Sequence, residues 1–352
     1  MQTDMETRYT WAAGLSQEQL AKQKAFFEVR VMHPKLEAVI EELLPLLTPY
    51  SESNLAFIVG ATGAGKSAFC RVALRKLYAQ QYERMQEHAA IIPIIAVEAY
   101  ANGDSRRTFR ELYQQMLREL KEPGINQKTY LEVDGSKARM RPSRTRARIG
   151  DLRESLESAL EQRQTEVCVI DEAYHLLRFD KDSDVLETLK SLSNTTGSKI
   201  VLVGSYDLFD LVESKGQCAR RSNVIHFDRY RSDDAEDRKA WRKIVKGLIA
   251  KWPCEQVPAL DAIADELLEI CLGCVGLLKS MLLEISAMQL RRKGRWDPKF
   301  LVKAAKANKL REVIRKEIEA GEEKVRDALY GQSMIDDSAL ARLITKMSAA
   351  HA

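Results

Sequence analysis

One glycine-rich segment constrains this chain more than any other. It reads Gly60-Ala61-Thr62-Gly63-Ala64-Gly65-Lys66-Ser67, which matches the spacing G-x-x-x-x-G-K-S. The apolar run 55–59 precedes it directly, and a helical pattern over 66–80 follows it. A glycine loop between a strand and a helix presents backbone N–H groups and the positive end of the helix to an anion. The segment is therefore predicted to be a phosphate-binding loop rather than a turn that merely joins a strand to a helix.

The loop motif assigns a role to each of its polar residues. Lys66 is expected to reach the β- and γ-phosphates of a nucleoside triphosphate, and Ser67 is expected to ligate Mg²⁺. The predicted nucleotide-binding residues are Gly60, Ala61, Thr62, Gly63, Ala64, Gly65, Lys66, Ser67 and Ala68.

A second apolar run ends in two carboxylates. Val167 to Ile170 is followed by Asp171 and Glu172. Asp171 is predicted to hold the Mg²⁺ through water, and Glu172 is predicted to orient or deprotonate the attacking water. An acidic pair at a strand end is common by chance, but together with the phosphate loop it predicts ATP hydrolysis.

The remaining pattern predicts an α/β fold with a parallel sheet. Short apolar runs recur at 55–59, 91–97, 167–170, 199–203 and 224–227, separated by helical stretches at 66–80, 107–120, 149–163 and 183–193. Continuous β-branched runs of this kind suit a parallel sheet that is covered on both faces, so a three-layer sandwich is expected. Beyond residue 231 the strand pattern stops, and helices predominate.

At roughly 150 residues per domain, 352 residues predict about two structural units. The expected divisions are an N-terminal extension (1–34), an α/β core (35–230) with a basic insertion near 121–148, a small all-helical lid (231–320) and a flexible C-terminal tail (321–352).

Three further positions have predicted roles. Ser205 follows the strand 199–203 and is expected to touch the γ-phosphate or the attacking water if that strand lies between the other two functional strands; a plain strand-end turn is the alternative. Arg220 or Arg221 is a candidate arginine finger for a neighbouring subunit, unless both are simply solvated. Lys279, near the start of a lid helix, is the candidate for a cation that returns over the phosphates, although helix-surface lysines are common.

Composition excludes several classes of protein. The net charge is only +4 although 30% of the residues are charged, so a histone-like positive surface is not the basis of function. The six cysteines are scattered through apolar or helical contexts, and Cys271 and Cys274 have no second pair at metal-binding spacing. They predict reduced thiols. No secretory leader or membrane-spanning run is evident, so a cytoplasmic protein is expected.

Basic residues are concentrated in the insertion. Between 131 and 150 the chain has six basic and two acidic residues, a net charge of +4 that equals that of the whole chain. Arginines at nearly alternate positions, with Ser, Thr and Gly between them, suit contacts to DNA phosphates that carry no base-reading information. The predicted DNA-binding residues are Arg106, Arg107, Lys137, Arg139, Arg141, Arg144, Arg146 and Arg148. A solvated charge run and a protein-docking arm are the alternatives.

Taken together, these motifs resemble the AAA+ superfamily, over about residues 35–310. Within it, the run Arg30 to Leu36 and the segment Asp171 to Leu176 look like the TniB/TnsC group of transposition regulators. That resemblance implies a protein that assembles with ATP and Mg²⁺ on double-stranded DNA, as a ring or filament, and links a target-selection protein to a DDE transposase. Two alternatives stay open: an interaction scaffold in which turnover is incidental, and a replication initiator or loader with the same core.

Overall fold

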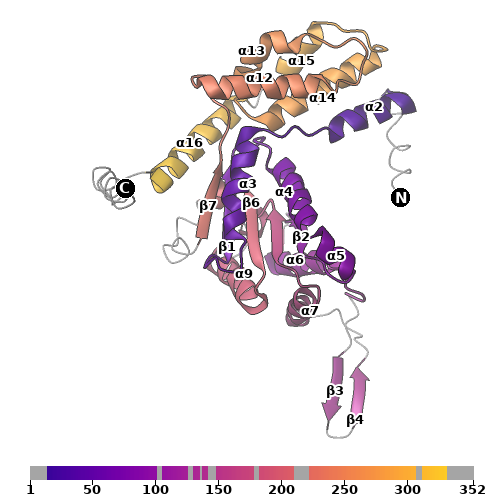
Figure 1. The fold of residues 1–352 in the computed structure, drawn as a ribbon, viewed down its shortest axis with the longest axis vertical. Coiled ribbons are helices and arrows are strands. Elements are labelled where there is room, and N and C mark those ends of the chain that lie inside the picture. Colours follow the sequence, from indigo (N-terminus) through magenta and orange to yellow (C-terminus); the bar gives the residue numbers. More distant parts are fainter. Residues whose placement is uncertain are drawn as a thin grey trace, which may run out of the picture.

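A computed structural model describes residues 14–100, 105–125, 130–134, 137–141, 148–177, 182–209, 222–306 and 311–330. Figure 1 shows an α/β body below a cap of helices, with a long helix, α16 (Arg311–Tyr330), running diagonally between them. Arg144, Arg146, Arg220 and Arg221 lie outside the described residues.

The five predicted strands form one parallel sheet. They are β1 (Leu55–Gly60), β2 (Ile94–Glu98), β5 (Val167–Asp171), β6 (Lys199–Gly204) and β7 (Ser222–Phe227). Their order in the sheet is β2-β5-β6-β1-β7. The prediction is confirmed, including its physical reason: β1 and β6 are buried along their whole length, because helices cover both faces.

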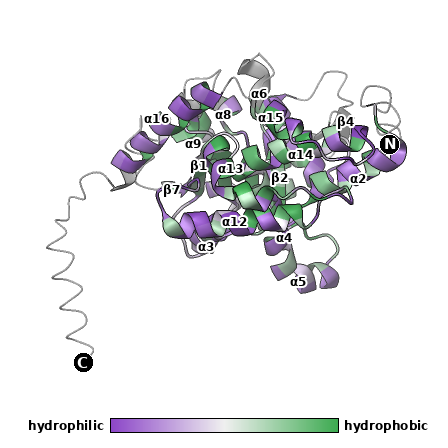
Figure 2. Cartoon of the chain, turned by 90° about the horizontal axis from the view of Figure 1, so that it is seen from above, coloured by the Kyte–Doolittle hydropathy of each residue, from purple (hydrophilic) through white to green (hydrophobic). Residues whose placement is uncertain are grey.

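Helices complete the three layers. On one face, α3 (Pro34–Leu46) and α4 (Lys66–Gln80) pack on β1 and its neighbours, and the short α5 (Tyr82–Glu87) follows α4. On the other face lie α6 (Ser105–Glu119), α7 (Ile149–Gln162), α8 (Tyr174–Leu177) and α9 (Asp182–Thr196). In Figure 2 the hydrophobic colouring gathers in the interior strands and on the inward sides of these helices.

The predicted insertion contains an antiparallel hairpin. It consists of β3 (Tyr130–Asp134) and β4 (Lys137–Arg141), and it projects from the α/β body on the side away from the lid (Figure 1). Its register places Lys137 opposite Asp134 and Arg139 opposite Glu132. Two of the three basic positions of β4 are therefore paired in register with acidic positions.

The lid is helical, as expected, and has its own core. It comprises α12 (Ala235–Ile249), the 3₁₀ helix η1 (Leu260–Ile263), α13 (Ala264–Ile270), α14 (Val275–Arg291) and α15 (Lys299–Lys306). Trp241 is fully buried among them, and its indole N–H donates to the Ala264 carbonyl at 2.9 Å. Cys271 packs into this core, whereas Cys274 packs into the main core of the α/β body, and burial raises the pKa of both thiols to about 12.

The segment predicted as a separate N-terminal extension belongs partly to the lid. Helix α2 (Gln17–Glu28) packs on α14: Gln19 donates to the Leu290 carbonyl at 2.7 Å, and Gln23 donates to the Leu283 carbonyl at 2.9 Å. Phe26 is buried, with its ring 5.3 Å from that of Trp252. The sequence signal here was only a moderate helical pattern, which does not reveal what the helix packs against.

The predicted start of the flexible tail at residue 321 is wrong. Helix α16 continues from Arg311 to Tyr330 without a break at residue 320 and returns to the α/β body. Ile318 and Val325 belong to the main hydrophobic core, each about 1% exposed. Residues 331–352 lie outside the described part of the chain. No helix among the described residues is sufficiently long and apolar to cross a membrane.

The docking of α16 predicts an unusual cost for a helical Gly→Ala change. A Cβ atom at Gly321 would lie 2.2 Å from the Tyr206 ring, whereas a Cβ at Gly150, in α7, would meet nothing within 4 Å. We expect Gly321→Ala to lower the free energy of unfolding by about 1–3 kcal/mol through overpacking. Gly150→Ala should be neutral or stabilise by up to about 1 kcal/mol. Urea denaturation of both variants tests this, and equal stability of the two would contradict the docking of α16.

Candidate nucleotide site

The phosphate loop has the backbone geometry of an anion site. Gly65 adopts φ 117°, a left-handed conformation that favours glycine, at the position before α4. The first hydrogen bond of the helix runs from the Phe69 N–H to the Gly65 carbonyl at 2.9 Å. The N–H groups of Lys66, Ser67 and Ala68 therefore precede the hydrogen-bond ladder and point out of the helix end.

Lys66 is buried at the centre of this loop. Its ammonium donates to the carbonyls of Gly60 and Ala61, both at 2.9 Å. Burial lowers the pKa of Lys66, and the charges of Glu172 and Asp171 act in the opposite direction. The structure thus brings the lysine and the two carboxylates, 105 residues apart in sequence, into one electrostatic site.

The carboxylates end β5 as predicted. Asp171 pairs with Glu98 of β2, and its carbonyl accepts from the Ala99 N–H at 2.9 Å. Glu172 adopts φ 51°, which is uncommon for a residue other than glycine. Such conformations cost about 1–3 kcal/mol, and the catalytic role of Glu172 stays a prediction.

Ser205 lies at the expected edge of the sheet. Strand β6, which precedes it, lies between β5 and β1, as the prediction for Ser205 requires. The Ser205 hydroxyl donates to the Asp207 carboxylate at 3.1 Å. Its contact with a γ-phosphate stays a prediction.

The lid contacts the phosphate loop through the backbone of Gly276 and not through the side chain of Lys279. The Gly276 N–H donates to the Gly63 carbonyl at 2.7 Å, and a Cβ at Gly276 would lie 2.5 Å from that oxygen. Leu277 packs directly over Gly63. Lys279 instead donates to the Phe26 carbonyl at 2.5 Å and lies 3.8 Å from the Phe26 ring centroid.

The placement of Lys279 over the phosphates is therefore not what the structure shows. Lys279 lies three residues after Gly276 in α14, and its side chain extends to Phe26 of α2 while the Gly276 backbone contacts the loop. Burial, with the charge of Arg30, lowers the pKa of Lys279 to about 8.

The predicted fingers and DNA contacts are mostly not described at side-chain level. Arg106 and Arg107 fall in the first turn of α6, Lys137, Arg139 and Arg141 fall in β4, and Arg148 is exposed just before α7. Strand β7 begins at Ser222, directly after Arg221, and Ser222 pairs with Leu55. That end of the sheet is about 17 Å along the strand from Gly60, at 3.3 Å per residue.

Helix α16 contributes residues that the sequence analysis missed. The Thr62 hydroxyl, in the phosphate loop, donates to the Glu317 carboxylate at 3.0 Å. The buried Glu322 accepts from the Arg229 guanidinium at 2.7 Å and pairs with Arg231 at 3.3 Å. The available signal was the apolar spacing Ile314, Ile318, Gly321 and Val325, which continues one helical stripe past residue 320.

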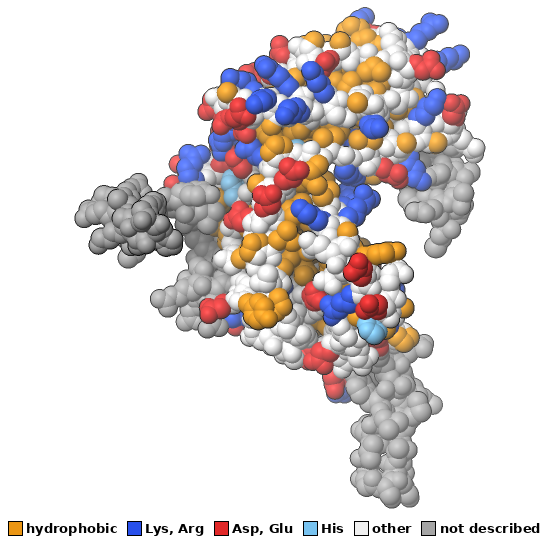
Figure 3. Space-filling model, in the orientation of Figure 1, with side chains coloured by type: hydrophobic (Ala, Val, Ile, Leu, Met, Phe, Trp, Pro, Cys, Tyr) orange, Lys and Arg blue, Asp and Glu red, His pale blue; other side chains and the backbone are white. Residues whose placement is uncertain are grey.

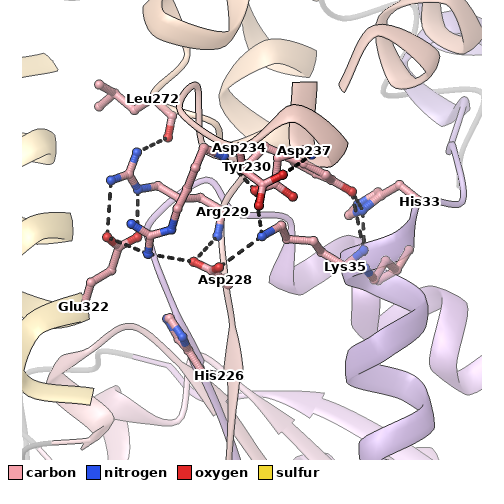
Figure 4. Close-up of polar contacts among 12 residues, drawn as sticks. His33, Lys35, His226, Asp228, Arg229, Tyr230, Asp234, Asp237, Leu272 and Glu322 are labelled. Atoms are coloured by element: carbon pink, nitrogen blue, oxygen red, sulfur yellow. Dashed lines mark hydrogen bonds and ion pairs between the residues drawn. The ribbon is translucent and has the colours of Figure 1, made fainter. Parts of the chain in front are cut away.

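A polar network joins the lid, β7 and the start of α3 (Figure 4). Lys35 forms ion pairs with Asp228 and Asp237, each at 3.0 Å. The Tyr230 hydroxyl lies 2.9 Å from His33 Nδ1, which also accepts from the Leu36 N–H at 3.3 Å as the cap of α3. These contacts fix where the chain passes from the α/β body into the lid.

His33 gives this junction a predictable response to pH. Burial, with the charge of Lys35, lowers the pKa of His33 from 6.5 to about 4. Because the folded protein resists protonation, stability that is complete above pH 6.5 is lost as the pH falls towards 4, by up to about 3 kcal/mol. His33→Asn can still cap α3 but does not titrate, so we expect its free energy of unfolding to fall less between pH 6.5 and 4. Denaturation at both pH values tests this, and identical pH dependence in the two proteins would contradict it.

Known proteins share parts of this sequence and fold. Residues 50–212 match the family model of the AAA domain. No curated protein matches the chain. The structure of the Aeropyrum pernix ORC1 protein in complex with DNA is similar, with a TM-score of 0.57 and 18% identity over 84% of this chain and 72% of ORC1. The structure of the ORC2 protein of the same organism, in ADPNP and ADP complexes, is also similar. Its TM-score is 0.54, and its sequence identity is 16% over 80% of this chain and 71% of ORC2.

At these identities the likeness concerns the fold, and neither match bears on the resemblance to the TniB/TnsC group. The match over residues 50–212, on a loop that has the expected geometry, shows that this chain contains an AAA-type ATPase domain, with an overall fold similar to that of ORC proteins.

Proposed function

We propose that this protein is an ATP-dependent DNA-binding AAA+ ATPase that assembles on duplex DNA. One observation carries the proposal: a buried lysine in a phosphate loop and two carboxylates at the end of β5 share one site beneath the lid. ATP and Mg²⁺ fit this donor set, because the loop offers N–H groups and a cation to phosphates and β5 offers oxygen ligands to a hard metal ion.

Each residue has a defined part in the proposed reaction. Lys66 and the N–H groups at the start of α4 hold the phosphates, and Ser67 and Asp171 hold Mg²⁺, which neutralises phosphate charge. Glu172 orients a water or accepts its proton. The Lys66 ammonium has to leave the carbonyls of Gly60 and Ala61 to reach a phosphate, so nucleotide binding moves this side chain.

A neighbouring copy is expected to complete the site. Arg220 or Arg221 is the proposed arginine finger, because a guanidinium stabilises the charge spread over the transferred phosphoryl group. ATP between adjacent copies then makes nucleotide binding and assembly one linked equilibrium.

DNA binding rests on the basic insertion and on the likeness to ORC1, whose structure contains DNA. Figure 3 shows blue side chains interspersed with red ones over the lid, so that face offers no broad surface of one sign. The candidate contacts are therefore Arg106, Arg107, β4 and the arginines that follow it, including Arg148. A plot of the logarithm of the DNA association constant against the logarithm of the salt concentration should have a negative slope, and each phosphate contact should add about −0.9 to it.

Two biological roles fit this biochemistry. The fold comparisons favour a replication initiator or loader. The motif resemblance at Arg30 to Leu36 and Asp171 to Leu176 favours a transposition regulator, whose partners would be a target-selection protein and a DDE transposase. The third alternative is an interaction scaffold in which ATP turnover is incidental. For a scaffold, the rate of phosphate release should be the same with and without DNA, which distinguishes it from both other roles.

Substitutions in the site test the nucleotide chemistry. Removing the ammonium in Lys66→Ala should weaken ATP binding by more than about tenfold and abolish assembly on DNA. Glu172→Gln should bind ATP and assemble, but hydrolyse at least about 100-fold more slowly. Titration calorimetry and phosphate release measure these effects. A Glu172→Gln protein that turns over at the wild-type rate with DNA present would show that the role of Glu172 is misassigned.

Footprinting separates the two biological roles. With a slowly hydrolysed ATP analogue, an initiator should protect discrete sequences on long genomic fragments. A transposition regulator of the proposed kind should protect duplex DNA uniformly, because its target is chosen by another protein. Discrete footprints would count against sequence-independent binding.

A further inference from the structure

The contact between Thr62 and Glu317 joins the phosphate loop to a helix that starts about 250 residues later. The Thr62 hydroxyl donates to the Glu317 carboxylate at 3.0 Å, and both side chains are exposed. The Glu317 charge is also near enough to Lys66 to favour the lysine's charged form. A negative charge therefore lies at the edge of the loop that is proposed to bind phosphates.

Glu317 is held in that place by the rest of α16. Five residues further along, about 7.5 Å on the helix axis, the buried Glu322 pairs with Arg229 and Arg231 (Figure 4). Gly321 lies so near the Tyr206 ring that no side chain fits between them. In Figure 2, α16 shows alternating hydrophilic and hydrophobic bands, as expected for a helix docked along one side.

Buried ion pairs are costly to break, since one uncompensated charge remains. The Glu322 end of α16 is therefore the fixed end. The Glu317 contact is an exposed neutral-to-charged hydrogen bond and is weaker. Any movement of α16 relative to the phosphate loop should accordingly begin at Glu317.

We propose that Glu317 is a built-in electrostatic competitor of the nucleotide: the phosphates of ATP break the Thr62–Glu317 contact and shift the first half of α16, while the Glu322 pair holds the second half. This inference rests on the proposed nucleotide site and adds the regulation of that site. The carboxylate and the phosphates carry like charges, so they cannot both occupy the loop edge without repulsion. The first half of α16 thereby responds to nucleotide binding, while the junction at Arg229 stays in place.

Charge removal at Glu317 gives a direct test. Glu317→Gln keeps an oxygen that can accept from Thr62 but removes the charge. We expect it to bind Mg·ATP about fivefold more tightly than wild type at low salt, with the difference shrinking as salt is added. The matched control is Glu323→Gln, an exposed glutamate about 9 Å further along the same helix, which should bind ATP as wild type does.

The outcomes are distinct. Equal affinity of wild type and Glu317→Gln would overturn the inference and leave the proposed ATPase intact. Weaker binding by Glu317→Gln would also overturn it, because it would make Glu317 a ligand of the magnesium nucleotide. Failure of all three proteins to bind ATP would overturn both proposals. Equal thermal midpoints in the two variants would show that their folding is the same.

Hydrogen exchange provides a second readout that does not depend on turnover. With a slowly hydrolysed ATP analogue, wild-type amides at 311–318 should exchange faster, while those at 322–328 stay protected. Unchanged or slower exchange at 311–318 would overturn the proposed movement.

Discussion

A phosphate-binding loop has to present backbone N–H groups and a cation to its ligand while the surrounding chain remains folded, and much of this structure is arranged around that constraint. The parallel sheet fixes the loop at the end of β1 and the carboxylates at the end of β5 on the same edge. On the lid side of the loop, the Gly276 N–H donates to the Gly63 carbonyl, an approach that a Cβ at position 276 would block.

Two segments distant in sequence meet at that loop. The lid supplies Gly276 and Leu277, and α16 supplies Glu317. The two contacts differ in chemistry: the lid uses a backbone hydrogen bond and an apolar side chain, and α16 uses a carboxylate. The network of His33, Lys35 and Tyr230 lies instead where the chain passes from β7 into the lid.

Lys279 lies in the lid helix where the motif predicted it, but its side chain contacts α2 and not the phosphate loop. Helix α14 begins where a lid helix was expected, and its first residues do reach the loop. The lysine, however, lies on the side of the helix that α2 covers, where the Phe26 ring and carbonyl provide a better partner than solvent. Helical phase relative to neighbouring helices decides this, and a four-residue motif does not contain that information.

The sequence by itself determined the phosphate loop, the five strands and the strand-end carboxylates, because glycine spacing and apolar runs are local signals that correspond directly to local geometry. It also determined that an all-helical part follows residue 231. Only the tertiary structure decided that β6 lies between β5 and β1, that α2 packs on the lid, and that α16 returns to the loop with Glu317 and Glu322. Those relations depend on which surfaces bury each other across hundreds of residues, and packing of that kind is not encoded in any one segment.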